Sequence, residues 1–182
     1  MSKKIAVIVG SLRKGSYSRQ IAKNMLGLFP KGYEAEIVEI GQLPFFNQDW
    51  EADLETPKEV AEFRKQIGGF DAVLFVIPEY NRSISGVLKN ALDVASRPYG
   101  QSKWNGNPAA IVSQSTGVIS GFGANHHLRQ ILTFLNMPTL QQPEAYLAKS
   151  PDLLDDKGKL AEGTLKFLQT VVDAFVELIK RY

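Results

Sequence analysis

The sequence contains no cysteine among its 182 residues. This absence excludes disulfide bonds, thiolate-bound metals, iron–sulfur clusters and cysteine nucleophiles. Histidine is scarce as well: the two copies are the neighbours His126 and His127, which cannot form the i, i+4 pair of a helical metal site. The sequence therefore predicts no metal centre, and any redox chemistry has to come from a bound cofactor.

Long apolar runs and an excess of one charge are also missing. No segment approaches the roughly 20 apolar residues that cross a bilayer, and Met1 to Lys4 lead directly into the first predicted strand, without room for a signal peptide. The 21 lysines and arginines are scattered among 19 acidic residues. That balance lacks the basic footprint of a nucleic-acid-binding protein. We expect a soluble, cytoplasmic protein with no nucleic-acid or membrane partner.

Apolar, β-branched runs alternate with segments of helical period along the whole chain. Strands are predicted at residues 4–10, 34–40, 71–77 and 109–113, with a weaker fifth that includes 139–141. Helices are predicted at residues 18–29, 56–67, 86–96, 124–135 and 160–181. This alternation is typical of a parallel sheet with helices on both faces. At this length we predict a single domain over residues 1–182.

Residues 41–56 form a segment that is too long for a simple connection, and it carries Phe45, Phe46 and Trp50. Aromatic residues are enriched at interfaces, so we favour a subunit contact over plain packing for these three. Trp104 precedes an Asn-Gly pair and is expected to cap another loop.

Three loops that follow predicted strands hold most of the unusual residues, and the first is GSLRKGSYSR at residues 10–19. It lacks both the GxGxxG and the GK[ST] pattern. Hydroxyls, a guanidinium and the free amides of a helix start suit a terminal monophosphate held without metal. The candidate ligands are Ser11, Arg13, Ser16 and Ser18. The alternative is that Ser16 or Ser18 only caps the helix and that Arg13 is a solvated charge.

The second loop is PEYNRSISG at residues 78–86. A proline at a strand end, followed by Glu79, Tyr80 and Asn81, offers backbone amides and carbonyls beside an aromatic face. Such a combination suits a flat polar heterocycle. The alternative is a plain loop in which Ser85 caps the next helix.

The third loop is SQSTGVISGFG at residues 113–123. Its glycines at 117, 121 and 123 permit close backbone approach or positive φ, so the segment can wrap a ligand or move as a lid. Flexibility alone would also explain these glycines. Ligands of doubly wound sheets bind at the carboxyl ends of the strands, so we expect the three loops to form one site.

Several motifs occur together in a fixed order: GSLRxxSxS at residues 10–18, PEYN at 78–81, SGVLKNALD at 85–93 and HLRQIL at 127–132. On these motifs the chain resembles the NADPH-dependent FMN reductase family, of the flavodoxin-like branch that includes chromate, quinone and azo-dye reductases. The resemblance covers essentially the whole chain. It implies an α/β fold, a flavodoxin-like doubly wound sheet of five parallel strands in the order 2-1-3-4-5 with helices on both faces.

The resemblance also implies FMN bound without covalent attachment. The phosphate would lie in the first loop, the ring and ribityl chain along the second, and the third loop near the ring. Together with the loop chemistry, this predicts the cofactor-binding residues Ser11, Arg13, Ser16, Ser18, Gln20, Pro78, Glu79, Tyr80, Asn81, Ser115, Thr116 and Gly117. We name no catalytic side chain, because the cofactor carries the chemistry.

The implied activity is a ping-pong oxidoreductase. NADPH or NADH would reduce FMN, and a small-molecule acceptor such as a quinone, flavin, azo compound or chromate would then enter the same cleft. The resemblance further implies a homodimer or homotetramer. The alternatives are a flavodoxin-like electron carrier or redox sensor without turnover, which an acidic surface would favour, and a phosphate-binding module without flavin.

One departure from the family pattern lies at residues 121–126, GFGANH. Relatives often carry an arginine in this glycine-rich segment before HLR. A substrate or subunit contact made by that arginine does not carry over to this chain. Phe122 is instead a candidate to cover the flavin.

Overall fold

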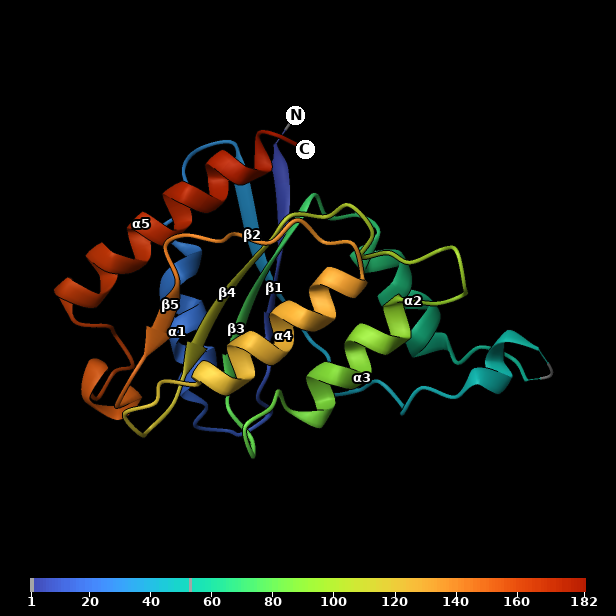
Figure 1. Cartoon of the computed structure of the whole chain (residues 1–182), viewed down its shortest axis with the longest axis horizontal. Helices are drawn as coiled ribbons and strands as arrows, with labels where there is room; N and C mark the ends of the chain where they lie inside the picture. The colour runs from blue at the N-terminus through green and yellow to red at the C-terminus, as the bar shows by residue number, and fades with distance from the viewer. Residues whose placement is uncertain (1, 53) are drawn as a thin grey trace.

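The computed structural model describes residues 2–52 and 54–182 (Figure 1). The strands in these residues are β1 (Lys3–Val9), β2 (Tyr33–Val38), β3 (Ala72–Pro78), β4 (Ala109–Gln114) and β5 (Ala145–Leu147). The α-helices are α1 (Tyr17–Leu26), α2 (Lys58–Ile67), α3 (Gly86–Ala95), α4 (Phe122–Phe134) and α5 (Glu162–Ile179). Two short 3-10 helices are η1 (Gln48–Glu51) and η2 (Ser150–Leu153). Each predicted helix is present within a few residues of its expected bounds.

The strands in the described residues form one parallel sheet in the order β2-β1-β3-β4-β5, as predicted. All seven residues of β3 are buried, because helices cover both faces of the sheet at its centre. The parallel pairing brings the carboxyl ends of β1, β3 and β4 to one edge. That edge carries the three loops singled out from the sequence.

Two hydrophobic clusters sandwich the sheet. Helices α2, α3 and α4 bury apolar side chains against one face, and α1 and α5 cover the other (Figure 1). Side chains alternate between these clusters along each strand, so Ile8 and Phe75 face the first, whereas Val7 and Leu74 face the second. Within residues 2–52 and 54–182, no helix has the length and apolarity that crossing a membrane requires.

The predicted position of the fifth strand is wrong. Thr139 makes a single bridge to Ala109, and the strand that pairs along β4 is β5, from Ala145 to Leu147. Ala145 and Leu147 are buried against the α1 and α5 side of the sheet. A strand of three residues carries too few side chains to show a clear alternation in the sequence.

The predicted role of Trp104 as a loop cap is also wrong. Its side chain is fully buried between α2, α3 and the sheet, and its indole Nε1 donates a hydrogen bond to the Leu92 carbonyl at 2.8 Å. Its ring centroid lies 6.4 Å from those of Phe63 and Phe75. The indole N–H finds a backbone acceptor, so burying this polar group costs little.

The segment between β2 and α2 is held against α3. The side-chain amide of Asn90 accepts a hydrogen bond from the Phe46 N–H at 2.8 Å and donates one to the Pro44 carbonyl at 2.9 Å. Phe46 and Trp50 meet edge to face and pack on the core, while Phe45 is exposed. Plain packing therefore accounts for Phe46 and Trp50, and the predicted subunit contact stays a prediction that depends on Phe45.

Candidate functional site

The loops that follow β1, β3 and β4 enclose a cavity of about 380 Å³. Its lining consists of Ser11, Arg13, Ser16, Tyr17, Pro78, Glu79, Tyr80, Gln114, Ser115 and Thr116. All of these except Tyr17 and Gln114 are predicted cofactor-binding residues. The three loops thus converge on one site at the carboxyl edge of the sheet, where doubly wound folds bind their ligands.

The first loop presents positive charge at the start of α1. Ser16 is the N-cap residue, and its Oγ accepts a hydrogen bond from the Arg19 N–H at 3.2 Å, as the capping alternative predicted. The Arg13 guanidinium donates to the Gly15 carbonyl and lies 4.8 Å from the centroid of the Tyr17 ring. The first turn of a helix leaves backbone N–H groups without intrahelical partners. Guanidinium and helix start together suit an anion.

The second arginine near this loop, Arg19, is already engaged. Its Nη1 and Nη2 donate to the two carboxylate oxygens of Glu39 at 2.7 and 2.6 Å. This bidentate pair lowers the pKa of Glu39 and raises the pKa of Arg19. Arg13 is therefore the guanidinium of the first loop that lines the cavity.

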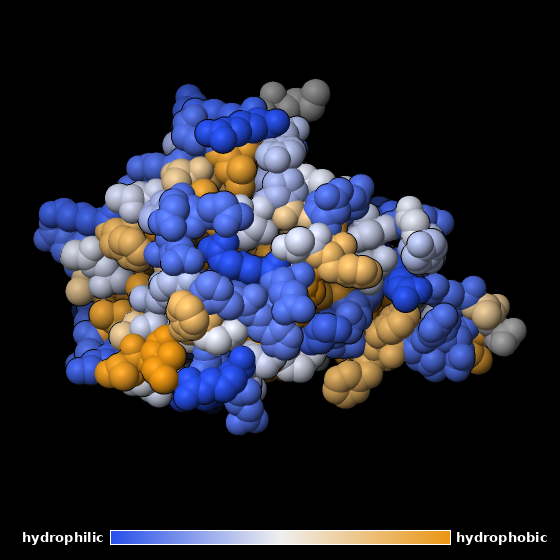
Figure 2. All heavy atoms as spheres, in the orientation of Figure 1, coloured by the Kyte–Doolittle hydropathy of each residue, from blue (hydrophilic) through white to orange (hydrophobic). Residues whose placement is uncertain are grey.

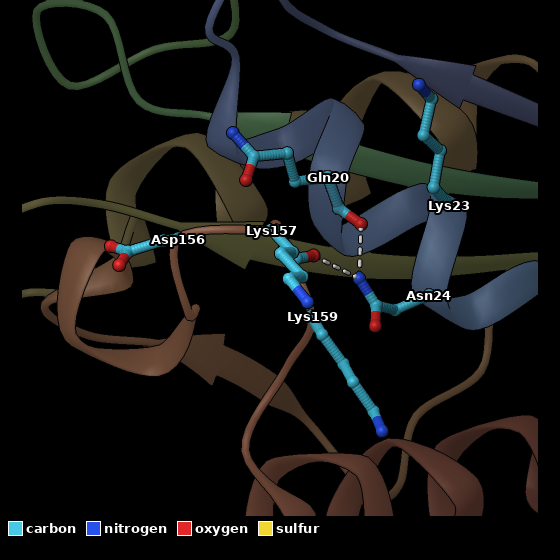
Figure 3. Close-up of a pocket in the computed structure, with 7 residues that line it drawn as sticks. Gln20, Lys23, Asn24, Asp156, Lys157 and Lys159 are labelled. Carbon is cyan, nitrogen blue, oxygen red and sulfur yellow. Dashed lines mark hydrogen bonds between the residues drawn. The ribbon is translucent and has the colours of Figure 1, made fainter.

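Two predicted phosphate ligands lie outside the cavity lining. Ser18 lies in the first turn of α1 and is fully buried. Gln20 lies on the wall of a separate polar hollow of about 520 Å³ beside α1 (Figure 3). The rest of that hollow is lined by Lys23, Asn24, Asp156, Lys157, Gly158 and Lys159. Asn24 Nδ2 joins its two sides, donating to the carbonyls of Gln20 and Gly158 at 2.8 Å each. Phosphate binding by Ser18 and Gln20 stays a prediction.

The second loop makes a tight turn at its tip. Tyr80 and Ser83 exchange two backbone hydrogen bonds of 2.9 Å. The residues between them, Asn81 and Arg82, have φ of 49° and 67°. Two successive residues with positive φ are typical of a type I′ turn. A side chain in such a conformation costs of order 1 kcal/mol, and strain of this kind concentrates at functional sites.

Contacts with the neighbouring loops fix the second loop in place. Ser85 occupies the N-cap position of α3, but its Oγ donates to the Gly10 carbonyl at 2.7 Å and does not cap the helix. Glu79 Oε2 accepts a hydrogen bond from the Ala124 N–H of α4 at 3.1 Å. Glycine at 123 permits this approach, since a Cβ there would lie 3.0 Å from Glu79 Oε2. The three loops therefore form one connected rim.

A buried chain of side-chain hydrogen bonds runs below the cavity. Ser150 Oγ donates to Gln114 Oε1 at 2.6 Å, and Gln114 Nε2 donates to Ser18 Oγ at 2.9 Å. Both serines are fully buried, and Gln114 is 6% exposed where it lines the cavity. Gln114 is not among the predicted site residues. A polar glutamine at the end of the apolar strand β4 is the sequence feature that indicates it. Tyr17 also lines the cavity, and the phosphate-ligand pattern of the first loop does not predict it.

The third loop is anchored to the end of β5. Ser115 donates its N–H to the Leu147 carbonyl at 3.0 Å and accepts a bond from the Ser150 N–H at 3.0 Å. The Lys149 N–H donates to the Gly117 carbonyl at 3.2 Å. These bonds hold the residues that line the cavity, so any lid movement has to come from the part of the loop beyond Gly117.

That outer part of the third loop is apolar and exposed. Val118, Ile119 and Phe122 are exposed, and Figure 2 shows apolar surface gathered over the β4–α4 connection. The Phe122 ring lies 4.2 Å from that of His126 and 5.4 Å from that of Tyr146. Burial raises the pKa of Tyr146 to about 12, so its phenol is neutral where it meets His126 Nε2 at 3.0 Å. Phe122 thus belongs to an aromatic cluster, and its role as flavin cover stays a prediction.

Comparison with known proteins decides the family. A model of the NADPH-dependent FMN reductase family matches residues 3–152. The chain belongs to this family. The resemblance inferred from the motifs is therefore confirmed, and so is the class of the protein as an oxidoreductase.

Named relatives of this FMN reductase family member span nearly its whole length. A quinone reductase of Pseudomonas putida is 54% identical over 97% of this chain and 94% of its own. A 2-hydroxy-1,4-benzoquinone reductase of Burkholderia sp. is 42% identical over 99% and 98%. The solved structure of FerB, a flavoenzyme NAD(P)H:(acceptor) oxidoreductase of Paracoccus denitrificans, matches with a TM-score of 0.90 and 41% identity over 98% of both chains. The flavodoxin-like arrangement predicted for the sheet agrees with this structure.

Proposed function

We propose that this protein is an NAD(P)H-dependent quinone reductase that uses FMN bound in the cavity between its three loops. The observation that carries the proposal is the convergence of a basic, hydroxyl-rich loop and a Pro-Glu-Tyr-Asn loop on one cavity. The names of the Pseudomonas and Burkholderia relatives support quinones as acceptors, and the NAD(P)H-dependence of the Paracoccus flavoenzyme supports a nicotinamide donor. We further propose that residues 1–182 act as one FMN-binding domain.

The donor groups in the cavity fit FMN. Arg13, Ser11 and the first turn of α1 offer the positive charge and hydroxyls that a phosphate dianion requires. Pro78 and Tyr80 offer flat apolar surface where the second loop lines the cavity. The carboxylate in the lining, Glu79, is occupied by the Ala124 N–H and by Arg82 at 3.3 Å. A flavin with its phosphate at α1 meets complementary groups at both ends.

The protein supplies binding and electrostatics to a reaction whose hydride transfer FMN itself supplies when bound. The loop amides near Glu79 to Asn81 and Ser115 to Gly117 would stabilise negative charge on the reduced ring, as an oxyanion hole does. The rigid rim keeps these amides in place. We assign no general acid or base to the chain.

Binding of donor and acceptor in the same cavity would give a ping-pong order. Donor and acceptor would use the same face of the flavin in turn, so each has to leave before the other enters. Initial rates measured at several acceptor concentrations should give parallel double-reciprocal lines. Free flavins, azo compounds and chromate would replace the quinone as acceptor. The rate of reduction of each, relative to that of 1,4-benzoquinone, defines the range of acceptors.

The first experiment is reconstitution. The protein is incubated with FMN, passed through gel filtration, and its visible spectrum is recorded before and after anaerobic addition of NADPH or, separately, NADH. A retained flavin band that bleaches and returns with 1,4-benzoquinone is expected. A band that neither donor bleaches would indicate an electron carrier or sensor, and no retained band would refute the cofactor assignment.

A matched pair of variants locates the phosphate. Arg13→Gln removes the guanidinium that lines the cavity, whereas Arg181→Gln removes an exposed one at the far end of α5. We expect the first to weaken FMN binding about tenfold or more, because hydrogen bonds to charged groups contribute about 1.5–3 kcal/mol. The second should bind FMN as the wild type does.

We also propose that the protein is a homodimer or homotetramer and that a second copy covers the face formed by α3 and α4. Hollows of about 430 and 520 Å³ adjoin there and share Phe134 and Leu135, and the Phe134 ring is almost fully exposed. A protruding ring beside a hollow on the same face is what a self-complementary contact needs. Light scattering should give a mass above 20.2 kDa that Phe134→Asp lowers.

A further inference from the structure

The tip of the second loop carries an arginine at a position that favours glycine. Arg82 follows Asn81 in the type I′ turn with φ of 67°. Glycine is the residue most often found at this turn position, because a Cβ is strained there. The turn therefore gains nothing from arginine, and the side chain itself needs an explanation.

The Arg82 side chain lies beside the cavity, in contact with Glu79 of its lining and with most of its surface in solvent. It is 69% exposed and reaches Glu79 through one long contact, Nη1 to Oε1 at 3.3 Å. Glu79 is in turn held by the Ala124 N–H at 3.1 Å. A single contact leaves most of the five guanidinium N–H donors free to meet a ligand.

The groups that face Arg82 favour an anion at the mouth of the cavity. The start of α4 lies against the backbone of Arg82, since a Cβ on Gly123 would be 3.1 Å from the Arg82 carbonyl oxygen. A helix start carries partial positive charge. Glu79 is the opposing negative charge, and its two oxygens already accept from Ala124 and Arg82.

We propose that Arg82 selects quinones that carry an ionised oxygen beside a ring carbonyl. The proposal depends on the proposed quinone reductase function and names the acceptor class for that site. A hydroxyquinone is a vinylogous carboxylic acid and is ionised at neutral pH, so its charge spreads over oxygens held in the plane of the ring. The planar fork of a guanidinium matches such a pair of oxygens, whereas an ammonium group does not.

The test compares two acceptors of nearly equal shape, the anionic 2-hydroxy-1,4-benzoquinone and the neutral 1,4-benzoquinone. Wild type, Arg82→Gln, Arg82→Lys and the remote control Arg181→Gln are loaded with FMN. Equilibrium binding of each quinone to the oxidised protein is followed by the change in flavin absorbance, without turnover. KM and kcat are then measured for each quinone with a saturating donor.

Arg82→Gln should raise both the Kd and the KM for the hydroxyquinone about tenfold, which corresponds to about 1.4 kcal/mol. Its values for 1,4-benzoquinone, its kcat and its KM for NADPH should stay unchanged. Arg82→Lys should restore only part of the affinity, because it keeps the charge and loses the fork. Added salt should weaken hydroxyquinone binding by the wild type, by the Arg181→Gln control and, to a smaller extent, by Arg82→Lys, and it should have the least effect on Arg82→Gln.

Three results would overturn the inference: equal changes for both quinones, no change for either, or an effect confined to the KM for NADPH. The last would assign Arg82 to the phosphates of the donor. Failure of the wild type to reduce 1,4-benzoquinone would instead refute the proposed function. A wild type that reduces it, with no selective defect in Arg82→Gln, refutes only the role of Arg82.

Discussion

Replacing Ser150 by alanine is the sharpest test of how the cavity is held in place. The change removes the hydroxyl that donates to Gln114 Oε1 at 2.6 Å in a fully buried position. The buried Gln114 Oε1 then loses its partner, and an unsatisfied buried polar group costs about 1–3 kcal/mol of the free energy of unfolding. Because Gln114 opens only to the cavity, we expect a loss near the middle of this range, about 2 kcal/mol.

The same change should weaken FMN binding. Gln114 lines the cavity and is oriented by Ser150 on one side and Ser18 on the other. With one anchor gone, the amide can rotate, and the loop at Ser115 loses part of its support. For a chain of this size, a loss of 2 kcal/mol lowers Tm by about 4–8 °C.

The assay is thermal unfolding of the protein without FMN, together with a fluorescence titration of FMN. Ser96→Ala is the matched control, since Ser96 Oγ also donates one short bond, to the Asp93 carbonyl at 2.7 Å, but lies away from the cavity. We expect the free energy of unfolding of the control to fall by about 1 kcal/mol or less and its affinity for FMN to equal that of the wild type. A Ser150→Ala variant with wild-type Tm and wild-type FMN affinity would refute the reasoning.

Two further predictions follow from buried rings. Trp104→Ala should lower the free energy of unfolding by about 3–5 kcal/mol, because it leaves a cavity at a fully buried site and removes the hydrogen bond to the Leu92 carbonyl. Chemical denaturation measures this loss, and a value below about 1 kcal/mol would contradict the prediction. Tyr146 should ionise near pH 12, later than an exposed tyrosine near about 10, in an ultraviolet absorbance titration. Its folded pKa is raised, so its contribution to stability is intact below about pH 10 and is lost as the pH rises toward 12, and Tyr146→Phe should remove that loss.

The strands at the centre of the sheet could be predicted because burial on both faces leaves a continuous apolar run. The residues 71–77 predicted for the third strand coincide with β3 apart from one residue at each end. Gly10 follows β1 and Pro78 ends β3, so these two residues mark where the first and second loops of the site begin. Because the strands are parallel, their carboxyl ends lie at the same end of the sheet, and the loops that follow them meet there.

Tertiary contacts decided the features that were mispredicted. Trp104 follows a turn-rich stretch, yet its ring fills the space between Phe63 and Phe75, residues far from it in the chain. The segment at Thr139 is apolar enough for a strand, but β5 takes the place beside β4. Local pattern cannot choose between two short segments that compete for one sheet edge.

The segment GFGANH at residues 121–126, which lacks the arginine found in many relatives, is explained by the contacts between the second loop and α4. Glycine at 123 leaves space that the Glu79 carboxylate and the Arg82 backbone fill. The carboxylate reaches the Ala124 N–H because no side chain stands between them. The arginine beside Glu79 consequently comes from the turn after β3 and not from the start of α4. Restoring a side chain at 123 would therefore displace Glu79 first, and through it the Arg82 guanidinium, so Gly123→Ala should weaken hydroxyquinone selection even though it removes no charge.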